Sequence, residues 1–419
     1  MITKGKRRMA YPRIVSRKEA LELILDSVHP LATIKLPLEG SLGYIAAEDL
    51  YAPTDLPRFN RSAMDGYAIC SKDTANATNK RSVKLKVVGE IHPSTAELIP
   101  IESGQAVRIM TGGPIPPGAD AVVKEEDARC EAGTLDVAGL VPASQHVWEK
   151  GKDIKKGSLL VEQGSPVTPA ILGILANLQI REVTVTRRPE VCILAVGNEL
   201  IDLHDKPTGH KIVASNIYML SAMIKQHGGR LRFAKISKND KGAIRKDIKE
   251  GLKGDMLIMT GGSSNAHSDL TRALMGEMGV ELRFAGVSMR PGKGTTFGLY
   301  DNKLLFGLPG TPTAVYVVFY TLVLPALLRL MGMAVQGPCC IEAVLEQDIN
   351  KTPGIEHLVQ GFVMEDSHYR VLPLVGPDIE VFPAMARANG LIIVGPDQAH
   401  LKQGQTVSVQ LLSSCISPL

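Results

Sequence analysis

The apolar positions in the middle of the chain predict strands that alternate with helices. Continuous apolar runs, typical of strands buried on both faces of a parallel sheet, cover residues 191–196, 256–259 and 303–306. Between the first two runs, the sequence is typical of two helices, at residues 217–227 and 241–251. We therefore expect a doubly wound α/β sheet of parallel strands over residues 188–334.

Two further regions have the pattern of small β-domains. Residues 54–141 contain short alternating runs, such as Val83–Val87, that glycine and proline clusters separate. Residues 335–419 hold more strand candidates between similar turns, at residues 341–345, 357–364, 369–374, 391–394 and 406–412. The expected fold is a multidomain α/β plus β protein, with a β-rich insert domain and a C-terminal small β-barrel or sandwich.

Three more helices are expected outside the strand-rich regions. Ser16 and Glu19 form a capping-box pattern before a helix at residues 17–28, and Pro169 suits the first position of a helix at residues 169–178. The longest apolar stretch, residues 314–328, is shorter than the roughly 18–20 residues of a membrane span. We expect it to be a buried core helix.

Composition narrows the function only a little. The length of 419 residues suggests two to four domains. Lys and Arg number 47 against 43 Asp and Glu, and a net charge of +4 does not favour nucleic acid, whose binding proteins concentrate positive charge in a patch. The six cysteines form no C-x-x-C pair and no apolar segment follows the basic N-terminus, which together indicate a cytoplasmic protein with free thiols.

Glycine-rich turns follow three of the predicted strands, where ligands bind in open α/β sheets. They lie at residues 196–200, 260–264 and 307–312. Glycine lets the backbone approach a ligand, and helix N-termini there favour oxyanions. A ligand cleft is one interpretation, and a set of tight strand-to-helix connections is the other. None of the turns matches the G-x-G-x-x-G or Walker pattern.

Several charged residues could carry chemistry. Arg290 and Lys293 surround a Pro-Gly turn, which suits either an oxyanion site or a solvated surface turn. Asp65 precedes a glycine among small residues, a pattern that is usually a plain turn. Magnesium prefers one or two carboxylates together with substrate phosphates. The candidate ligands are Glu199, Asp240 and Asp269, although isolated acids are normally solvated.

In order along the chain, these segments resemble the MoeA family of molybdopterin molybdenumtransferases, which includes the E-domain of gephyrin. Residues 60–67 look like its S-A-M-D-G-Y signature, and residues 108–126 are similar to its M-T-G-A-P…G-A-D-A-V-V…E motif. Shorter segments resemble its G-D-E-L, P-G-K, G-L-P-G and K-T-P-G motifs, at residues 197–200, 291–293, 307–310 and 351–354. The resemblance runs from about residue 11 to the C-terminus.

The resemblance implies four domains in an elongated subunit. These are a linking and dimerisation domain of residues 10–53 and 142–187, a β-rich domain of residues 54–141, a MogA-like α/β domain of residues 188–334 and a β-barrel domain of residues 335–419. It also implies a homodimer in the cytoplasm, with molybdopterin adenylyltransferase as the upstream partner and with no nucleic-acid or membrane partner.

The reaction of the family takes molybdate and adenylylated molybdopterin, requires Mg²⁺ and releases AMP. By position, Asp65 matches an acid tied to metal insertion and nucleotide hydrolysis, Thr111 a threonine that contacts substrate, and Glu199 an acid of the cleft. Substrate-binding residues are expected at Gly261, Gly262, Ser263, Arg290, Lys293, Gly310 and Thr311, the two cations being placed for molybdate or phosphate. The expected metal ligands are Asp269 and Asp240.

The chain departs from the family pattern at several pocket positions. Asn198 replaces an aspartate, Ala266 a glycine and Thr311 an asparagine. Where the family has an arginine and a Gly-Ser pair, the chain has residues 355–357 and 376–380, which include Glu356, Asp378 and Ile379. Acids in an oxyanion pocket are expected to repel molybdate. An alternative therefore stays open, a divergent paralogue that binds another pterin or nucleotide ligand, or acts as a scaffold, without insertase turnover.

Overall fold

The computed structural model describes residues 13–78, 80–261, 273–335, 337–375 and 381–412. The chain forms two compact units. The first contains the described residues of Met1–Glu48, Gln163–Leu172 and Arg181–Leu419. The second contains those of Asp49–Glu162 and Gly173–Ile180. Each unit is described by itself below.

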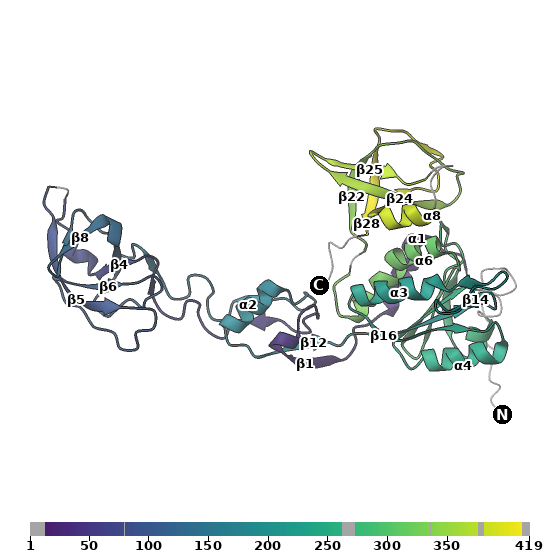
Figure 1. The fold of residues 1–419 in the computed structure, drawn as a ribbon, viewed down its shortest axis with the longest axis horizontal. Helices are drawn as coiled ribbons and strands as arrows, with labels where there is room; N and C mark the ends of the chain where they lie inside the picture. The colour runs from purple at the N-terminus through teal and green to yellow at the C-terminus, as the bar shows by residue number, and fades with distance from the viewer. Residues whose placement is uncertain (1–12, 79, 262–272, 336, 376–380, 413–419) are drawn as a thin grey trace, which may run out of the picture. The chain divides into compact units, whose positions relative to one another are not determined.

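A six-stranded sheet forms the centre of the first unit (Figure 1). Its four parallel strands include the three predicted ones, and their order is β16 (Arg230–Ser237), β13 (Glu190–Val196), β17 (Met256–Gly261) and β21 (Lys303–Leu308). Two antiparallel strands, β20 (Thr296–Tyr300) and β18 (Glu281–Ala285), extend the sheet beyond β21. The predicted parallel core is therefore present, and one edge of the sheet is mixed.

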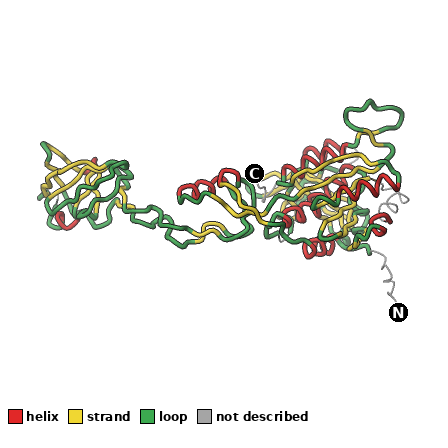
Figure 2. The backbone as a smooth tube through the Cα atoms, turned by 90° about the horizontal axis from the view of Figure 1, so that it is seen from below, coloured by secondary structure: helices red, strands yellow, loops and turns green. Residues whose placement is uncertain are grey.

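Helices cover both faces of this sheet, as Figure 2 shows. Because successive side chains of a strand point to opposite faces, Val191 and Ile193 of β13 pack with α3 (Ser215–Gln226), whereas Cys192 and Leu194 pack with α4 (Lys241–Gly251). Asp240 caps α4, since its carboxylate accepts a hydrogen bond from the N–H of Ala243 at 2.8 Å. The doubly wound architecture is confirmed.

The expected core helix is longer than residues 314–328. Its 19 residues, Pro312–Leu330, reach the length and apolar composition of a membrane span, but 78% of its 18-residue window of mean hydropathy 1.8 is buried inside the protein. It consists of α6 (Pro312–Val318), a π-helical turn (Phe319–Val323) and α7 (Leu324–Leu330). In the π turn, the N–H of Leu324 bonds to the carbonyl of Phe319 instead of Tyr320. The next residue, Pro325, has no N–H to offer. The carbonyl of Tyr320 instead accepts from Nε2 of Gln410 at 3.1 Å.

The N-terminal segment packs against the same core. Helix α1 (Arg17–Ser27) begins at Ser16, whose hydroxyl oxygen accepts from the N–H of Glu19 at 3.1 Å. Strand β1 (Thr33–Pro37) pairs with β12 (Glu182–Thr186) in antiparallel register. Residues from the two segments of the expected linking domain thus lie side by side. The division into four domains stays a prediction.

The C-terminal part of the first unit is a closed five-stranded barrel, which decides between the two expected forms. Its strands follow each other in the order β24 (Glu356–Glu365), β25 (Tyr369–Pro373), β22 (Cys340–Leu345), β28 (Thr406–Leu411) and β26 (Gly390–Val394), and β26 pairs again with β24. Helix α8 (Val381–Arg387) lies between β25 and β26 in sequence. Strand β19 (Met289–Arg290) leaves the α/β domain to pair in parallel with β24.

The second unit is built on another six-stranded sheet. Its order is β7 (Ala121–Lys124), β4 (Gly66–Ile69), β6 (Gln105–Ile109), β5 (Val83–Ile91), β9 (Thr134–Val137) and β8 (Ala128–Glu131). Both faces are buried, because Tyr67 and Ile69 of β4 join one apolar cluster and Ala68 joins another. The β-rich domain is therefore present.

Short elements complete the chain. Helix α2 (Pro169–Asn177) begins at the predicted proline. Two-stranded pairs are β2 (Leu50–Tyr51) with β11 (Leu159–Val161), β3 (Arg61–Ser62) with β10 (Val147–Trp148), β14 (Leu200–Ile201) with β15 (Ile212–Val213), and β23 (Ile349–Asn350) with β27 (His400–Leu401). Single 3₁₀ turns cover Leu38–Gly40, Ser71–Thr74 and Glu125–Asp127.

Candidate active site

Asp65 and Thr111 are in direct contact in the second unit. Asp65 precedes β4 and Thr111 follows β6, and these two strands are neighbours with Gly66 opposite Ile109. Oδ1 of Asp65 accepts hydrogen bonds from the backbone N–H of Thr111 at 2.6 Å and from its hydroxyl at 2.7 Å. Two of the predicted catalytic residues, 46 positions apart in sequence, thus form one structural element.

These hydrogen bonds favour the ionised form of the exposed Asp65 carboxyl. The hydroxyl and the N–H of Thr111, followed by the charge of Arg108, hold the pKa of Asp65 below its usual value. Among the described residues, Oδ2 of Asp65 accepts no hydrogen bond. The carboxylate is therefore fixed through one oxygen and can offer the other to a ligand.

Close packing of β4 against β7 explains why a glycine follows Asp65. A Cβ atom at Gly66 would lie 1.9 Å from the carbonyl oxygen of Val123 on the neighbouring strand. Only glycine lets β4 approach β7 this closely. The Asp-Gly pair is thus the start of a buried central strand.

The three glycine-rich turns of the first unit surround one pocket of about 110 Å³. It opens where β13, β17 and β21 end, and Glu199, Gly261 and Gly310 line it. Gly261 has a φ of +100°, and a Cβ there would lie 2.4 Å from the carbonyl oxygen of Val196. This close approach of two strand ends explains the glycine. Gly262, Ser263 and Asp269 lie outside the described residues.

Asn216, which the sequence analysis did not single out, joins the turns around this pocket. Its Nδ2 donates to Oγ1 of Thr260 at 3.0 Å and to the carbonyl of Gly310 at 2.8 Å. The hydroxyl of Thr260 in turn donates to the carbonyl of Pro309 at 3.0 Å. The start of α3 is thereby bonded to the ends of β17 and β21. An asparagine at the start of a predicted helix could have been noticed in the sequence, but its burial and its partners could not.

Arg290 lies beside His357 where β19 pairs with β24. Paired residues of neighbouring strands project to the same face of a sheet. The pKa of His357 is lowered by partial burial and then by the positive charges of Lys351 and Arg290. Lys351 donates to the carbonyls of Ile355 and Pro396, at 2.9 and 3.2 Å. Arg290 and Lys351, together with the ring of His357 beside their charges, are called the cation cluster below.

The cation cluster lacks a balancing acid in the described part of the chain. The ion pairs there include no partner for Arg290 or Lys351 of the cluster, and none for Lys293 near it. Lys293, three residues after Arg290, is exposed. Unpaired cations at the junction of the α/β domain and the barrel suit an oxyanion.

Glu356 does not act as an uncompensated acid next to this cluster. Nε and Nη2 of Arg17 lie 2.5 and 3.1 Å from its two carboxylate oxygens. Since neighbouring side chains of a strand alternate, Glu356 also faces away from His357. Arg17 of α1 thus supplies a counter-charge to the acid that was expected to repel an oxyanion, and the repulsion itself stays a prediction. Asp378 and Ile379 lie outside the described residues.

Comparison with known proteins agrees with this geometry. A model of the MoeA N-terminal region (domain I and II) matches residues 15–178, one of a probable molybdopterin binding domain matches residues 192–329, and one of the MoeA C-terminal region (domain IV) matches residues 342–412. A molybdopterin molybdenumtransferase of Staphylococcus epidermidis is 32% identical over 402 residues, which are 96% of each chain. The chain belongs to the MoeA family.

Further relatives support membership of the MoeA family. A molybdopterin molybdenumtransferase of Staphylococcus aureus is 32% identical over 95% of both chains. Two structures of the molybdopterin biosynthesis MoeA protein from Pyrococcus horikoshii superpose with TM-scores of 0.84 and 0.82, at 29% and 26% identity, and cover 96% and 95% of this chain and all of theirs. The predicted fold and the predicted transferase family are confirmed. Membership assigns the chain to molybdenum cofactor biosynthesis.

Three further positions that the sequence analysis singled out in this MoeA-family chain lie at helix caps or in a loop contact. Asp240 is occupied as the cap of α4, and its role as a metal ligand stays a prediction. Asn198, which replaces the family aspartate, accepts a hydrogen bond from the N–H of Asn239 at 3.0 Å. Thr311 stands at the N-cap of α6 without a side-chain hydrogen bond to the helix. Within the described residues, no three His, Cys, Asp or Glu side chains cluster as a metal site.

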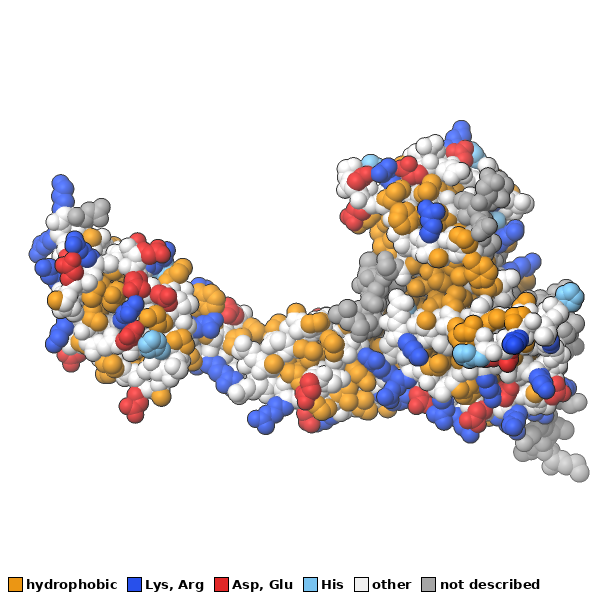
Figure 3. All heavy atoms as spheres, in the orientation of Figure 1, with side chains coloured by type: hydrophobic (Ala, Val, Ile, Leu, Met, Phe, Trp, Pro, Cys, Tyr) orange, Lys and Arg blue, Asp and Glu red, His pale blue; other side chains and the backbone are white. Residues whose placement is uncertain are grey.

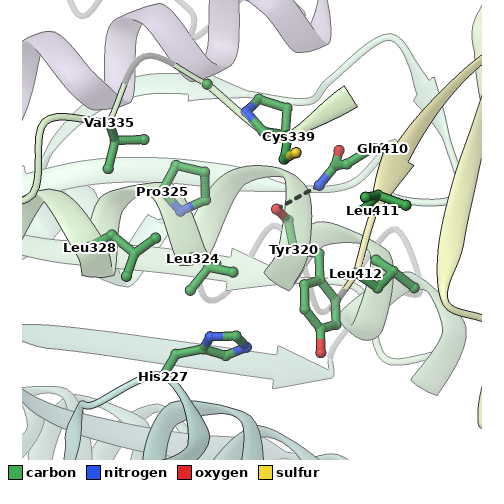
Figure 4. Close-up of a pocket in the computed structure, with 12 residues that line it drawn as sticks. His227, Tyr320, Leu324, Pro325, Leu328, Val335, Cys339, Gln410, Leu411 and Leu412 are labelled. Carbon is green, nitrogen blue, oxygen red and sulfur yellow. Dashed lines mark hydrogen bonds between the residues drawn. The ribbon is translucent and has the colours of Figure 1, made fainter. Parts of the chain in front are cut away.

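A second pocket of about 50 Å³ lies between α7 and strand β28 of the barrel. In Figure 4 the amide of Gln410 points at the backbone of Tyr320, and the ring of His227 lies below Leu324. His227 is 1% exposed, and burial lowers its pKa. This pocket holds none of the predicted site residues, and most of its lining is apolar.

On the face shown in Figure 3, acidic and basic side chains are interspersed over the α/β domain.

Proposed function

We propose that this MoeA-family protein inserts molybdenum from molybdate into adenylylated molybdopterin, with Mg²⁺ as the divalent cation and with release of AMP. The observation that carries the proposal is the Asp65–Thr111 contact. It supplies an ionised carboxylate with one oxygen fixed by two short hydrogen bonds. Such a group can orient a water molecule or bind a cation next to a phosphate.

The acids of the chain fit a magnesium ion that the substrate helps to hold. Magnesium is bound through one or two carboxylates together with phosphate oxygens and water, so it needs no cluster of three protein ligands. Asp65 is an exposed carboxylate that meets this requirement. When bound, the cation would neutralise phosphate charge and polarise the bond that breaks when AMP leaves.

The cation cluster suits the anionic reactant. Arg290 and Lys351 offer fixed positive charge, and neither has an acidic partner among the described residues. Guanidinium and ammonium groups bind tetrahedral oxyanions through charge-assisted hydrogen bonds. Molybdate is a doubly charged oxyanion of this kind. We therefore assign molybdate to the charges of Arg290 and Lys351, with the ring of His357, whose pKa is lowered, as a neutral hydrogen-bond donor beside them.

The test compares two aspartates with similar surroundings. Purified protein receives adenylylated molybdopterin, molybdate and Mg²⁺, and AMP release is followed. Asp65→Asn should slow the release at least about a hundredfold. Asp73→Asn is the matched control, because Asp73 is a partly exposed carboxylate that also accepts from a hydroxyl (Ser103, 2.5 Å) and from a backbone N–H (Gly104, 2.9 Å). Equal rates for the two variants would remove Asp65 from the reaction.

A wild-type protein that binds the substrate but releases no AMP would favour the alternative of a divergent paralogue without turnover. The homodimer, the upstream adenylyltransferase partner and the cytoplasmic location stay predictions. A mass measurement in solution tests the homodimer. Co-purification with the adenylyltransferase tests that protein as a partner.

A further inference from the structure

Trp148, the one tryptophan of the chain, lies at the surface of the second unit in contact with an arginine. Its side chain belongs to a residue that is 40% exposed. The guanidinium carbon of Arg61 lies over the indole ring, 4.7 Å from its centroid. A cation at this distance is attracted by the negative face of the ring. The two residues are called the Arg61–Trp148 pair below.

The guanidinium of this pair has no other partner in the described part of the chain. The ion pairs of the second unit include none with Arg61, and no side-chain hydrogen bond there uses its N–H groups. A guanidinium has five N–H donors. Tryptophan and arginine are also the side chains that most often dominate binding surfaces. An exposed pair of the two, with unused donors, is therefore a candidate binding surface.

The pair lies in the same structural element as the Asp65–Thr111 contact. Arg61 is opposite Trp148 where β3 pairs with β10. On the other side of β3, the carbonyl of Ser62 accepts at 2.8 Å from the N–H of the residue after Thr111. Neighbouring strands are about 4.8 Å apart, and Arg61 precedes Asp65 by only four residues. All of these residues belong to the second unit.

We infer that the Arg61–Trp148 pair is a stacking platform for the adenine base of adenylylated molybdopterin. Bases stack on indole rings and on guanidinium planes, because both offer a flat, polarisable surface. The platform rests on the proposed function, in which the Asp65 carboxylate acts at the phosphate that carries the adenosine. Adenine and this phosphate belong to one nucleotide, so the surface that binds the base has to lie near Asp65, as the pair does.

The chemistry of the pair favours adenine over the other groups of the substrate. Adenine is uncharged, flat and aromatic in both of its rings, so its whole face can stack. The pterin of molybdopterin is reduced and flat over only one of its rings. A phosphate would bind the N–H edge of the guanidinium, and it would gain nothing from the indole ring. Binding that depends on the base therefore distinguishes stacking from a plain phosphate contact.

Trp148 itself reports the binding, because no other tryptophan contributes to the fluorescence. Full-length protein is titrated with AMP in the presence of Mg²⁺, and tryptophan is excited selectively. A base stacked on the pair should change the emission of Trp148 in a saturable manner. Ribose 5-phosphate, which has the sugar and the phosphate but no base, should leave the emission unchanged at the same concentrations.

Substitutions in the pair separate stacking from charge, with AMP binding measured by equilibrium dialysis. Arg61→Lys keeps the positive charge and loses the plane, and Trp148→Leu loses the ring. Each should weaken AMP binding at least about fivefold. Trp148→Phe keeps an aromatic face and should bind AMP within about threefold of wild type. Arg188→Lys is the matched control, because its guanidinium lies 4.4 Å from the ring centroid of Tyr44 in the first unit.

Several results would overturn the platform. AMP could leave the emission of Trp148 unchanged, or ribose 5-phosphate could alter it as much as AMP does. Arg61→Lys and Trp148→Leu could bind AMP as wild type does, with thermal unfolding showing that both are folded. Labelled AMP could also be displaced more readily by 6-hydroxymethylpterin than by adenosine, which would place the pterin on the pair.

The same variants distinguish the platform from the proposed function. A protein that binds AMP through Arg61 and Trp148 but releases no AMP from the complete substrate would keep the platform and lose the insertase. A protein that releases AMP while Arg61→Lys and Trp148→Leu bind AMP as tightly as wild type would keep the insertase and lose the platform.

Discussion

Arg17 of α1 and Glu356 of β24 form a bidentate ion pair across 339 positions of sequence, with nitrogen–oxygen distances of 2.5 and 3.1 Å. Their side chains are only 13% and 20% exposed. The pair joins the N-terminal helix to the barrel strand that also carries His357. It therefore stabilises the junction at which the cation cluster lies.

Removing Arg17 should damage this junction more than removing both charges. Arg17→Gln leaves the Glu356 carboxylate partly buried without its counter-charge, and we expect a loss of about 1–3 kcal/mol in the free energy of unfolding. The double variant Arg17→Gln with Glu356→Gln should recover most of this loss. Denaturant unfolding measures the free energy of unfolding of the single and the double variant. Identical stabilities of wild type and Arg17→Gln would show that the ion pair contributes nothing.

Thr111 should set the acidity of Asp65. The Thr111 hydroxyl is the largest cause of the lowered pKa of Asp65, so Thr111→Val should raise that pKa toward its ordinary value. If AMP release requires the ionised Asp65 carboxylate, the acid limb of the pH–rate profile of Thr111→Val shifts to higher pH than in wild type. Thr95→Val serves as control, because its hydroxyl oxygen accepts from the N–H of His92, away from Asp65. An unshifted acid limb in Thr111→Val would mean that another group titrates.

Arg290 should bind molybdate and not the pterin substrate. Arg290→Gln removes a cation of the cluster, and we expect KM for molybdate to rise about tenfold while KM for adenylylated molybdopterin changes little. Arg129→Gln is the control, because Arg129 is an exposed residue paired with Glu131 at 2.9 Å. A rise in the pterin KM alone would contradict the assignment.

The buried His227 should make folding stability depend on pH. Burial lowers its pKa in the folded state, so below about pH 6.5 the unfolded chain takes up a proton that the folded chain excludes. Stability therefore falls as the pH falls through the unfolded pKa. His227→Phe, next to Phe319 and Tyr320, should show a smaller drop in Tm between pH 7.5 and 5.5 than wild type. Equal drops would assign the dependence to other groups, such as His357.

Local signals in the sequence were sufficient for most of the fold. Helix α4 begins and ends at the predicted residues because Asp240 caps it and its apolar positions follow the helical period. Strand β16 was not predicted, since it is an edge strand with charged residues among its apolar ones. The antiparallel strands β18 and β20 were also missed, because their pairing depends on tertiary contacts.

The glycine-rich turns around one pocket were predictable from the strands that they follow, and the rest of the site only where the family resemblance supplied it. The contact of Asp65 with Thr111 depends on the register in which β4 pairs with β6. This register cannot be predicted from the residues between the two strands. The cation cluster arises from a two-residue pairing of β19 with β24, across 67 positions between Arg290 and His357. Asn216 could not be assigned a role, because its partners come from the ends of two other strands.

The stoichiometry of the complete reaction tests the central claim most directly. Wild-type protein is given adenylylated molybdopterin, Mg²⁺ and limiting molybdate, and AMP and protein-bound molybdenum cofactor are quantified together. The insertase account predicts about one AMP per molybdenum incorporated, and no incorporation when molybdate is omitted. Bound adenylylated molybdopterin without AMP or incorporated molybdenum, under conditions in which a known molybdopterin molybdenumtransferase is active, would contradict it.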